Sequence, residues 1–466
     1  MKHYPSLIPP HVSPPLDQAF KPAALCKMAF EDEIKKSDDS MPLNIALERP
    51  DGTVSHYAWV IVPPHHPRCP ENLFHIERII KFLLWQKGGY KIYIADAPHA
   101  AAFLQEQFSL NGARAFDVHF FSDQVYLKPL SIIACSLKEL PPESETEKSL
   151  GRHLDGNRIG FDLGASDLKV SAVSNGESIF STEIVWEPRK HSDPRYHYDH
   201  IMNALKIAAS KLPKVEAIGG SAAGIYVNNR VMVASLFRSI PPERFHEVRD
   251  MFLTIQKEFG VPLEVVNDGE VTALAGSMSL GVNAILGIAL GSSEAGGYVT
   301  SQGNITNWLN ELAFAPIDYN PEAPIDEWSG DRGCGASYLS QQCIFRLAPQ
   351  AGINLPQDAT DAEKLLFVQE LLEKNDERAL ACWHTMGVYL GYAIAHYASF
   401  YTLQHVLILG RCTSGKGGSI LLEEAQRVLH QEFPSLYQTL HIHLPDEKSR
   451  RVGQSIAAAS LPIRQP

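Results

Sequence analysis

The sequence of 466 residues lacks several features that would assign it to a class directly. Its seven cysteines form no CxxC pair and no regular spacing, which argues against a disulfide framework and predicts reduced thiols in a cytoplasmic protein. The proline-rich N-terminus has no apolar stretch of the kind found in signal peptides. Acidic residues outnumber basic ones, and the net charge of -12 argues against nucleic acid as the main ligand.

Long apolar runs are also scarce, with one exception at residues 379–401, which contain no Asp, Glu, Lys or Arg. The histidines, aromatic residues and glycines of this stretch predict a helix buried in a large domain, not a membrane span. The composition, with 45% hydrophobic and 20% charged residues, is typical of a globular protein. The length predicts about two to four domains.

The patterns along the chain predict four segments. Residues 1–40 form an N-terminal arm that is first proline-rich and then charged. Residues 41–150 contain a hairpin pattern with an Asp-Gly turn, then an amphipathic helix and a strand. Residues 151–275 contain a hairpin with an Asn-Gly turn, a helix and further strands, and residues 276–466 combine strands with mostly helical sequence.

The second and third segments repeat one order of elements. Gly52 and Gly176 lie in the two hairpin turns, and His75 and His200 lie in the two helices, at a nearly constant offset. Such an offset predicts an internal repeat, in which residues 41–150 are a degenerate copy of the lobe that follows. A chance likeness between two ordinary βα units is the alternative.

Four polar loops that contain glycine each follow an apolar strand: "DLGAS" at 162–166, "NDGE" at 267–270, "GSSEAGG" at 291–297 and "GRCTSGKGGS" at 410–419. Small residues let backbone N–H groups approach phosphate oxygens closely. A carboxylate such as Asp162 can hold a hydrated metal ion. Asn267 or Asp268 can cap the helix that follows, and we expect Asp268 both to cap it and to be directed at a substrate.

In their order along the chain, the stretches "FDLGASDLKV", "GGSAAG", "VVNDGEVTALAG", "GIALGSSEAGGYV", "NELAF" and "HVLILGR" resemble the ROK family of sugar kinases and sugar-responsive repressors. The resemblance covers roughly residues 158–462. It implies an α/β fold of the actin-like, ribonuclease H-like type, in which two lobes bind ATP with Mg²⁺ and a sugar. Residues 41–150 would be an additional α/β region outside this fold, or a degenerate lobe.

The resemblance also implies roles for single residues. Asp268 would be the general base, because a sugar hydroxyl is a poor nucleophile and must be oriented and deprotonated during transfer. Asn267 and Glu311 would bind sugar hydroxyls, and Asp162 would hold Mg²⁺ through water. The remaining positions would bind the nucleotide and its phosphates: Gly164, Ser166, Gly291, Ser292, Ser293, Gly410 and Arg411.

Several positions depart from the family pattern. Phe314 stands where a histidine would contact sugar and zinc, and Glu327 and Ser329 replace two cysteines of the zinc loop. Only Cys334 remains, and one thiolate cannot form the tetrahedral site of structural zinc, so we predict no zinc. Glu294 would add a negative charge close to the phosphates.

The segment from residue 308 to 335 offers a replacement for the lost sugar ligands. Trp308 or Trp328 would stack on a sugar face, and Asp326 or Asp331 would accept its hydroxyls. The alternative is a surface loop with tryptophans in the core.

Together these patterns predict an ATP-dependent kinase that acts on a sugar or polyol. One alternative is a non-catalytic sensor or regulator of the same family, and another is ATP hydrolysis coupled to a partner protein. Residues 1–150 contain no basic recognition helix, so DNA is not an expected partner. A membrane is not expected either, because residues 379–401 predict a buried helix. A homodimer is implied by the resemblance alone.

Overall fold

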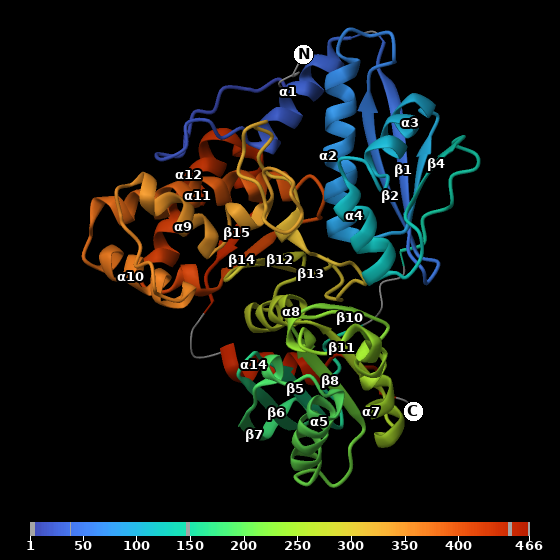
Figure 1. The fold of residues 1–466 in the computed structure, drawn as a ribbon, viewed down its shortest axis with the longest axis vertical. Helices are drawn as coiled ribbons and strands as arrows, with labels where there is room; N and C mark the ends of the chain where they lie inside the picture. The colour runs from blue at the N-terminus through green and yellow to red at the C-terminus, as the bar shows by residue number, and fades with distance from the viewer. Residues whose placement is uncertain (1–4, 38, 146–149, 446–449, 465–466) are drawn as a thin grey trace. The chain divides into compact units, whose positions relative to one another are not determined.

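Figure 1 shows the computed structural model of the protein, which describes residues 5–37, 39–145, 150–445 and 450–464. Contacts between residues divide the chain into two compact units. Unit 1 consists of Met1–Thr146, Ile288–Gly296 and Trp308–Leu444, and unit 2 consists of Glu147–Gly287, Gly297–Asn307 and Pro445–Pro466. The four predicted segments stay a prediction, and the boundary near residue 150 adjoins residues 146–149, which lie outside the described part.

Unit 2 is built on a five-stranded sheet in the order β11-β8-β5-β6-β7. The strands are β5 (Asn157–Leu163), β6 (Asp167–Ser174), β7 (Glu177–Val185), β8 (Ala217–Ala222) and β11 (Leu263–Asn267). β5, β8 and β11 run parallel, and β6 and β7 continue from β5 as an antiparallel meander. The three parallel strands therefore end at one edge of the sheet, which is where open α/β sheets bind ligands.

Helices and a small hairpin complete unit 2 (Figure 1): α5 (Pro194–Ala209), α6 (Phe245–Arg249), α7 (Met251–Phe259), α8 (Asp268–Leu280), α14 (Arg450–Ala459), β9 (Ile225–Val227) and β10 (Arg230–Val233). The three short 3₁₀ turns are η2 (Pro188–Lys190), η3 (Ser235–Phe237) and η4 (Pro242–Arg244). α14 lies so close to the sheet that a Cβ atom at Gly219 would lie 1.7 Å from the carbonyl oxygen of Ala458. The small residues in both elements are therefore required by their close approach.

A second sheet, most of it in unit 1, has the order β13-β12-β14-β15. Its strands are β12 (Ile285–Leu290), β13 (Glu294–Val299), β14 (His405–Leu409) and β15 (His441–His443). The helices and 3₁₀ turns that follow in this part are α9 (Gln341–Gln350), α10 (Asp361–Glu373), α11 (Glu377–Tyr397), α12 (Lys416–Glu432), α13 (Pro434–Tyr437), η5 (Leu312–Phe314), η6 (Gly335–Ser337) and η7 (Arg411–Thr413). α11 is the buried helix predicted at residues 379–401, and none of the described helices is long and apolar enough to cross a membrane.

The N-terminal part of unit 1 contains a third sheet, in the order β2-β1-β3-β4. Its elements are α1 (Ala23–Lys35), β1 (Met41–Glu48), β2 (Val54–Ile61), α2 (Cys69–Lys87), β3 (Lys91–Ala95), α3 (Pro98–Gln107), α4 (Ala115–His119), the π-helix η1 (Phe120–Val125) and β4 (Ser131–Cys135). Every residue of α2 from His75 to Lys87 is buried, although its sequence predicts an amphipathic helix with one solvated face. The polar face of α2 therefore contacts other parts of unit 1.

The four strands of the N-terminal sheet run in the same relative directions as four of the five strands of the unit 2 sheet. β1 is antiparallel to both β2 and β3, and β3 is parallel to β4. Removing β5 from the order β7-β6-β5-β8-β11 would leave the same pattern of directions. The likeness agrees with the predicted repeat, whose origin by duplication stays a prediction. The strand without a counterpart is β5, which carries Asp162.

Residues 5–22 of the predicted N-terminal arm lie along unit 1, and the chain then enters α1. The backbone N–H groups of His11 and Val12 donate hydrogen bonds to Glu432 of α12, at 2.6 and 2.9 Å. Further along, the ring of Phe20 packs between those of Tyr389 and Tyr392, with centroid distances of 4.7 and 6.0 Å. The arm is thus part of the packed structure of unit 1.

Candidate functional site

Three neighbouring strands of unit 2 place polar side chains at their carboxyl ends. The register pairs Asp162 of β5 with Ser221 of β8, and it pairs Ser221 with Val266 of β11. The hydroxyl of Ser221 donates a hydrogen bond to Oδ1 of Asp162 at 2.7 Å. Asn267 and Asp268 follow Val266 directly, so the parallel register aligns both sequence-predicted residues with the strand end that holds Asp162.

Asn267 acts as the N-cap of α8. Its Oδ1 accepts a hydrogen bond from the backbone N–H of Gly269 at 2.7 Å, and its Nδ2 donates one to the carbonyl oxygen of Gly224 at 2.8 Å. The cap is therefore Asn267 and not Asp268, which is the first residue of the helix. The amide of Asn267 keeps one N–H and one lone pair for a ligand.

Asp268 has the chemical character of a general base. The side chain is half-buried, and its Oδ1 accepts a hydrogen bond from the N–H of Gly269 at 3.0 Å. Burial raises the pKa of Asp268 to about 6, and the charge of Asp162 adds to the rise. No described lysine or arginine counteracts this shift. A carboxylate with a pKa close to neutrality can accept a proton from a hydroxyl and release it again.

Two residues around Asp162 were not predicted from the sequence. Burial raises the pKa of Asp162, whereas the hydrogen bond from Ser221 and the charge of Lys169 oppose the rise. Lys169 lies directly opposite Asp162 in the register of β5 and β6, and its Nζ lies 3.0 Å from Oδ1 of Asp167. The sequence signal was available, since Lys169 is a charged residue within an otherwise apolar strand, "LKVSAV".

The predicted first phosphate loop is the turn between β5 and β6. The N–H of Gly164 donates to the carbonyl oxygen of Asp167 at 2.8 Å, which closes the turn, and the Trp186 indole donates to the carbonyl oxygen of Gly164 at 2.9 Å. Ser166 is exposed at the tip, with its hydroxyl 3.4 Å from Oδ2 of Asp167. The two hydrogen bonds of Gly164 hold the base of the turn, and its exposed tip is accessible to a ligand.

The other predicted nucleotide-binding residues lie in unit 1, on two loops that touch each other. Gly291 begins a turn in which its N–H donates to the carbonyl oxygen of Ser293 at 3.1 Å, and Ser292 and Ser293 are exposed. Gly410 has φ +101°, and a Cβ atom there would lie 2.5 Å from the carbonyl oxygen of Leu290. Only glycine fits in this contact. The contact holds the loop after β14, which carries the exposed Arg411, against the end of β12, which leads into the turn at Gly291.

Glu294 does not add a negative charge beside this turn, contrary to the expectation from the sequence. Its side chain is directed into unit 1, where the hydroxyl of Tyr397 donates to Oε1 at 2.8 Å. Burial raises the pKa of Glu294 to about 8, so the group is protonated at neutral pH. The correction follows from burial, because an isolated charge in an apolar interior is more costly than a bound proton.

The segment that carries Glu311 is held by α2. The N–H of Asn310 donates to the carbonyl oxygen of Gln86 at 2.9 Å, and that of Glu311 donates to the carbonyl oxygen of Trp85 at 3.0 Å. Phe314, which the resemblance places where a histidine is expected, stacks on the indole of Trp85 with a centroid distance of 4.2 Å. Phe314 thus anchors this segment to the N-terminal part, a contact that the sequence alone did not indicate.

Three of the four residues predicted to replace the lost sugar ligands are engaged elsewhere. The ammonium of Lys87 lies 4.4 Å from the centroid of the Trp308 ring, and Asp326 accepts hydrogen bonds from Ser329. Asp331 lies in a buried cluster of charges. Trp328 is 74% exposed. Three of the four side chains are thus engaged within unit 1, but the alternative is wrong in one respect, because the exposed Trp328 and the half-buried Trp308 do not lie in the core.

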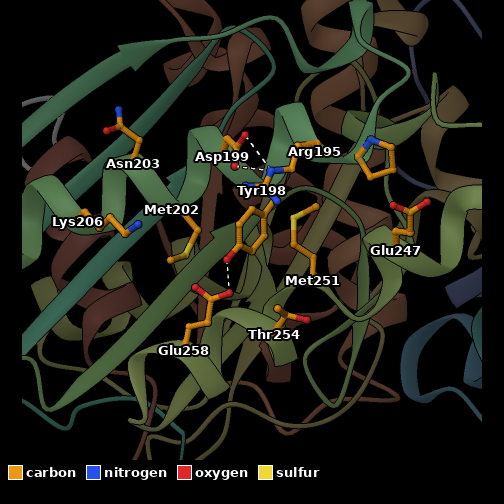
Figure 2. A pocket seen from close by; sticks show the side chains of 11 residues that line it. Arg195, Tyr198, Asp199, Met202, Asn203, Lys206, Glu247, Met251, Thr254 and Glu258 are labelled. Atoms are coloured by element: carbon orange, nitrogen blue, oxygen red, sulfur yellow. Dashed lines mark hydrogen bonds and ion pairs between the residues drawn. The ribbon is translucent and has the colours of Figure 1, made fainter.

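The described residues contain no group of three or more His, Cys, Asp or Glu side chains placed to hold a metal ion. An open groove of about 590 Å³ lies between α5 and the α6–α7 segment of unit 2 (Figure 2). Arg195 pairs with Asp199 in its lining, and none of the predicted site residues lines it. The groove is therefore separate from the strand ends that carry Asp162 and Asp268.

Comparison with known proteins identifies this arrangement. The fold resembles that of a ROK hexokinase from Thermus thermophilus, with a TM-score of 0.52 and 18% identity over 65% of this chain and 97% of the hexokinase. It also resembles a ROK transcriptional regulator described as a homologue of the E. coli MLC protein, with a TM-score of 0.50 and 20% identity over 66% of this chain and 78% of the regulator. No curated protein matches the chain.

These likenesses assign the protein to the actin-like, two-lobed ATPase folds, as the sequence predicted. The sequence pattern of the ROK family matches residues 158–450, which is more than half of the chain. The protein belongs to the ROK family. The family match leaves out the arm and the third sheet.

Proposed function

We propose that this protein transfers a phosphoryl group from ATP to a hydroxyl of a sugar or sugar derivative. The observation that carries the proposal is Asp268, a half-buried carboxylate at a strand end whose pKa is about 6 and which no described cation neutralises. A carboxylate with a purely structural role would be expected to have a paired cation.

Each unit has its own part in this reaction. In unit 2, Asp268 orients the acceptor hydroxyl and takes its proton as the new bond to phosphorus forms, and the remaining amide donor of Asn267 contacts a second hydroxyl. At the turn that begins with Gly164, whose own N–H closes the turn, the exposed residues 165 and 166 donate backbone N–H groups to phosphate oxygens. In unit 1, the turn at 291–293 and the loop at Gly410 and Arg411 bind the rest of the nucleotide, and Glu311 binds sugar hydroxyls.

The donor set at Asp162 fits Mg²⁺. This ion binds through one or two carboxylates and completes its shell with water and substrate phosphates, so a group of three protein ligands is not required. Mg²⁺ held by Asp162 would neutralise charge on the phosphates. The raised pKa values of Asp162 and Asp268 support this assignment, because a cation relieves the repulsion between two neighbouring carboxylates.

The test is release of ADP from Mg²⁺-ATP in the presence of a panel of hexoses, N-acetylhexosamines and polyols. We expect turnover with at least one of them, and Asp268→Asn should reduce it by about 10²- to 10⁴-fold. Asp250→Asn is the matched control, since Asp250 is an exposed carboxylate of unit 2 that pairs with Arg230. Turnover that survives in Asp268→Asn would contradict the assignment of the base.

A second candidate function is a non-catalytic regulator that binds a sugar. Two expected sugar-binding positions of unit 1 favour this candidate. Position 314 is an apolar phenylalanine that stacks on Trp85, and the carboxylate of Asp331 is occupied by Arg78. Sugar binding in calorimetry without ADP release from any member of the panel would favour the regulator.

A further inference from the structure

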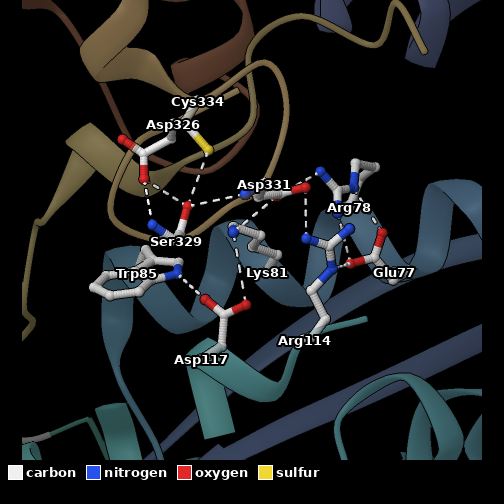
Figure 3. A network of polar contacts seen from close by, with 10 residues as sticks. All are labelled: Glu77, Arg78, Lys81, Trp85, Arg114, Asp117, Asp326, Ser329, Asp331 and Cys334. Atoms are coloured by element: carbon white, nitrogen blue, oxygen red, sulfur yellow. Dashed lines mark hydrogen bonds and ion pairs between the residues drawn. The ribbon is translucent and has the colours of Figure 1, made fainter. Parts of the chain in front are cut away.

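The loop at residues 325–335 of unit 1 presents one carboxylate to three cations. Oδ2 of Asp331 lies 2.9 Å from Nη1 of Arg78 and 2.8 Å from Nζ of Lys81, and Oδ1 lies 2.5 Å from Nη1 of Arg114. Figure 3 shows these side chains converging on Asp331 from α2 and from the start of α4. All three cations therefore come from the N-terminal part, outside the family match.

The cluster is balanced in charge. Glu77 pairs with Arg78 and Arg114 at 2.6 Å in each case, and Oδ2 of Asp117 lies 3.6 Å from Nζ of Lys81. Three cations thus face three carboxylates. Burial works to raise the pKa of Asp331, but the charges of Arg78, Lys81 and Arg114 outweigh it and hold the pKa well below its ordinary value. Asp331 is consequently ionised at neutral pH.

The loop itself is shaped to present Asp331. Asp326 accepts hydrogen bonds from the N–H and the hydroxyl of Ser329, at 2.7 and 2.6 Å, and its own N–H donates to the carbonyl oxygen of Asp331 at 2.7 Å. Ile325 and Arg332 form an isolated bridge across the base of the loop. Contacts within the loop thus fix its shape, and Asp331 is the side chain that joins it to the cations of the N-terminal part. The sulfur of Cys334 lies at the end of the loop, 4.0 Å from the hydroxyl of Ser329.

One face of α2 holds this loop and the segment with Glu311 together. Lys81 contacts Asp331, and Trp85, one turn later in α2, holds Glu311 through its carbonyl oxygen and Phe314 through its ring. The indole of Trp85 also donates to Oδ1 of Asp117 at 2.7 Å, which connects it to the charge cluster. The loop at residues 325–335 and the segment with Glu311 are thus held by the same turns of α2.

We propose that α2 is a positioning element for the sugar-binding half of the site, and that the cluster around Asp331 fixes the loop and segment that a bound metal would otherwise have to order. This inference rests on the proposed kinase function for its effect on catalysis. The ordering of the loop by the cluster can be tested without any activity.

The experiment compares three variants of the full chain. Asp331→Asn removes the anchoring charge. Lys81→Met with Asp117→Asn removes one charge of each sign, so the remaining cluster stays neutral and the variant is expected to fold even if Asp331→Asn does not. Glu48→Gln is the matched control, because Glu48 is a partly buried carboxylate of the N-terminal sheet that bonds only to Tyr90, Lys91 and Tyr93.

Hydrogen exchange is read first. Amides of residues 308–314 and 325–335 should exchange at least about tenfold faster in the first two variants and at the wild-type rate in Glu48→Gln. For the acceptor that the panel identifies, KM should rise about fivefold or more, while KM for ATP stays within about twofold. A merely structural role would change both constants together or neither.

Exchange that is unchanged in both cluster variants would overturn the proposal, and so would an equal rise of the two Michaelis constants. If the wild type phosphorylates no member of the panel, the kinase function fails, and faster exchange in the two segments would still establish their positioning by α2. The two failures are therefore distinguishable.

Discussion

Asp268 in unit 2 and Asp331 in unit 1 are both shielded carboxylates, yet their surroundings act on them in opposite directions. Burial and the charge of Asp162 raise the pKa of Asp268 to about 6. Three cations hold the pKa of Asp331 well below its ordinary value, although burial acts to raise it. A shielded carboxylate without a cation can exchange a proton near neutral pH, whereas one among cations is fixed as a charge. The difference separates a residue suited to chemistry from one suited to structure.

The largest expected effect is on stability. Asp331→Asn leaves the buried Arg78 and Lys81 and the mostly buried Arg114 facing two carboxylates. It should lower the free energy of unfolding by about 3–5 kcal/mol. Asp268→Asn removes a carboxylate that no described cation stabilises, so its melting temperature should equal or exceed that of the wild type. Thermal unfolding of both variants at pH 7 checks the contrast. A similar loss in both would remove the distinction.

Glu294 is a third buried carboxyl group for this comparison. It lies inside unit 1, and no described cation lowers its pKa. Its raised pKa means that the folded protein keeps the proton up to about pH 8, whereas the unfolded chain releases it near its ordinary value. Stability should therefore fall as pH rises through this range and level off above about 8. Glu294→Gln lacks this contribution, so its stability should fall less over this range and should exceed that of the wild type by about 1–3 kcal/mol at pH 8.

Chemical unfolding at pH 6, 7 and 8 measures this effect. Glu423→Gln is the control, since Glu423 is exposed on α12 and should leave the pH dependence unchanged. Identical pH profiles for the wild type and Glu294→Gln would show that the carboxyl group is ionised in the folded protein.

A smaller effect concerns the pair in unit 2. The rate should fall as pH drops through about 6, because the base is then protonated. Asp162→Asn removes the neighbouring negative charge, so the pKa of Asp268 should fall and the acidic limb should move to lower pH by up to about one unit. Profiles of kcat/KM between pH 4.5 and 8 measure the shift, and a limb that moves upward would contradict the proposed coupling.

The last prediction is that a zinc chelator has no effect on stability. A zinc chelator such as 1,10-phenanthroline should leave the melting temperature and any phosphoryl transfer unchanged, because the loop near Cys334 is ordered by the Asp331 cluster. Removal of Mg²⁺ by EDTA should stop transfer and leave the melting temperature nearly unchanged. A loss of stability with phenanthroline would point to a metal in the loop.

The sequence predicted the fold well where local pattern and position along the chain agree. The strand end at Asp162, the strand and helix around Asp268 and the buried helix at 379–401 follow from apolar runs that end in polar turns. It predicted less where partners come from distant segments. Lys169 opposite Asp162 depends on strand register, and the burial of Glu294 depends on Tyr397 of α11.

The largest gap concerned α2. Its charged residues indicated a solvated face, since charges on a helix are usually exposed. Arg78 and Lys81 are buried because Asp331, more than two hundred residues later in the chain, complements them. No local pattern carries that information. The same reason explains why Asp331 and Trp308 were expected to be available to a sugar.

The contact between His11 and Glu432 has a consequence for how the protein is made. The ribosome synthesises His11 421 residues before Glu432, its acceptor on α12. Phe20 likewise has no tyrosines to pack against until Tyr389 and Tyr392 of α11 have been synthesised. The ring of Phe20 therefore stays uncovered for a long interval of synthesis, and that interval is when a chaperone would bind it.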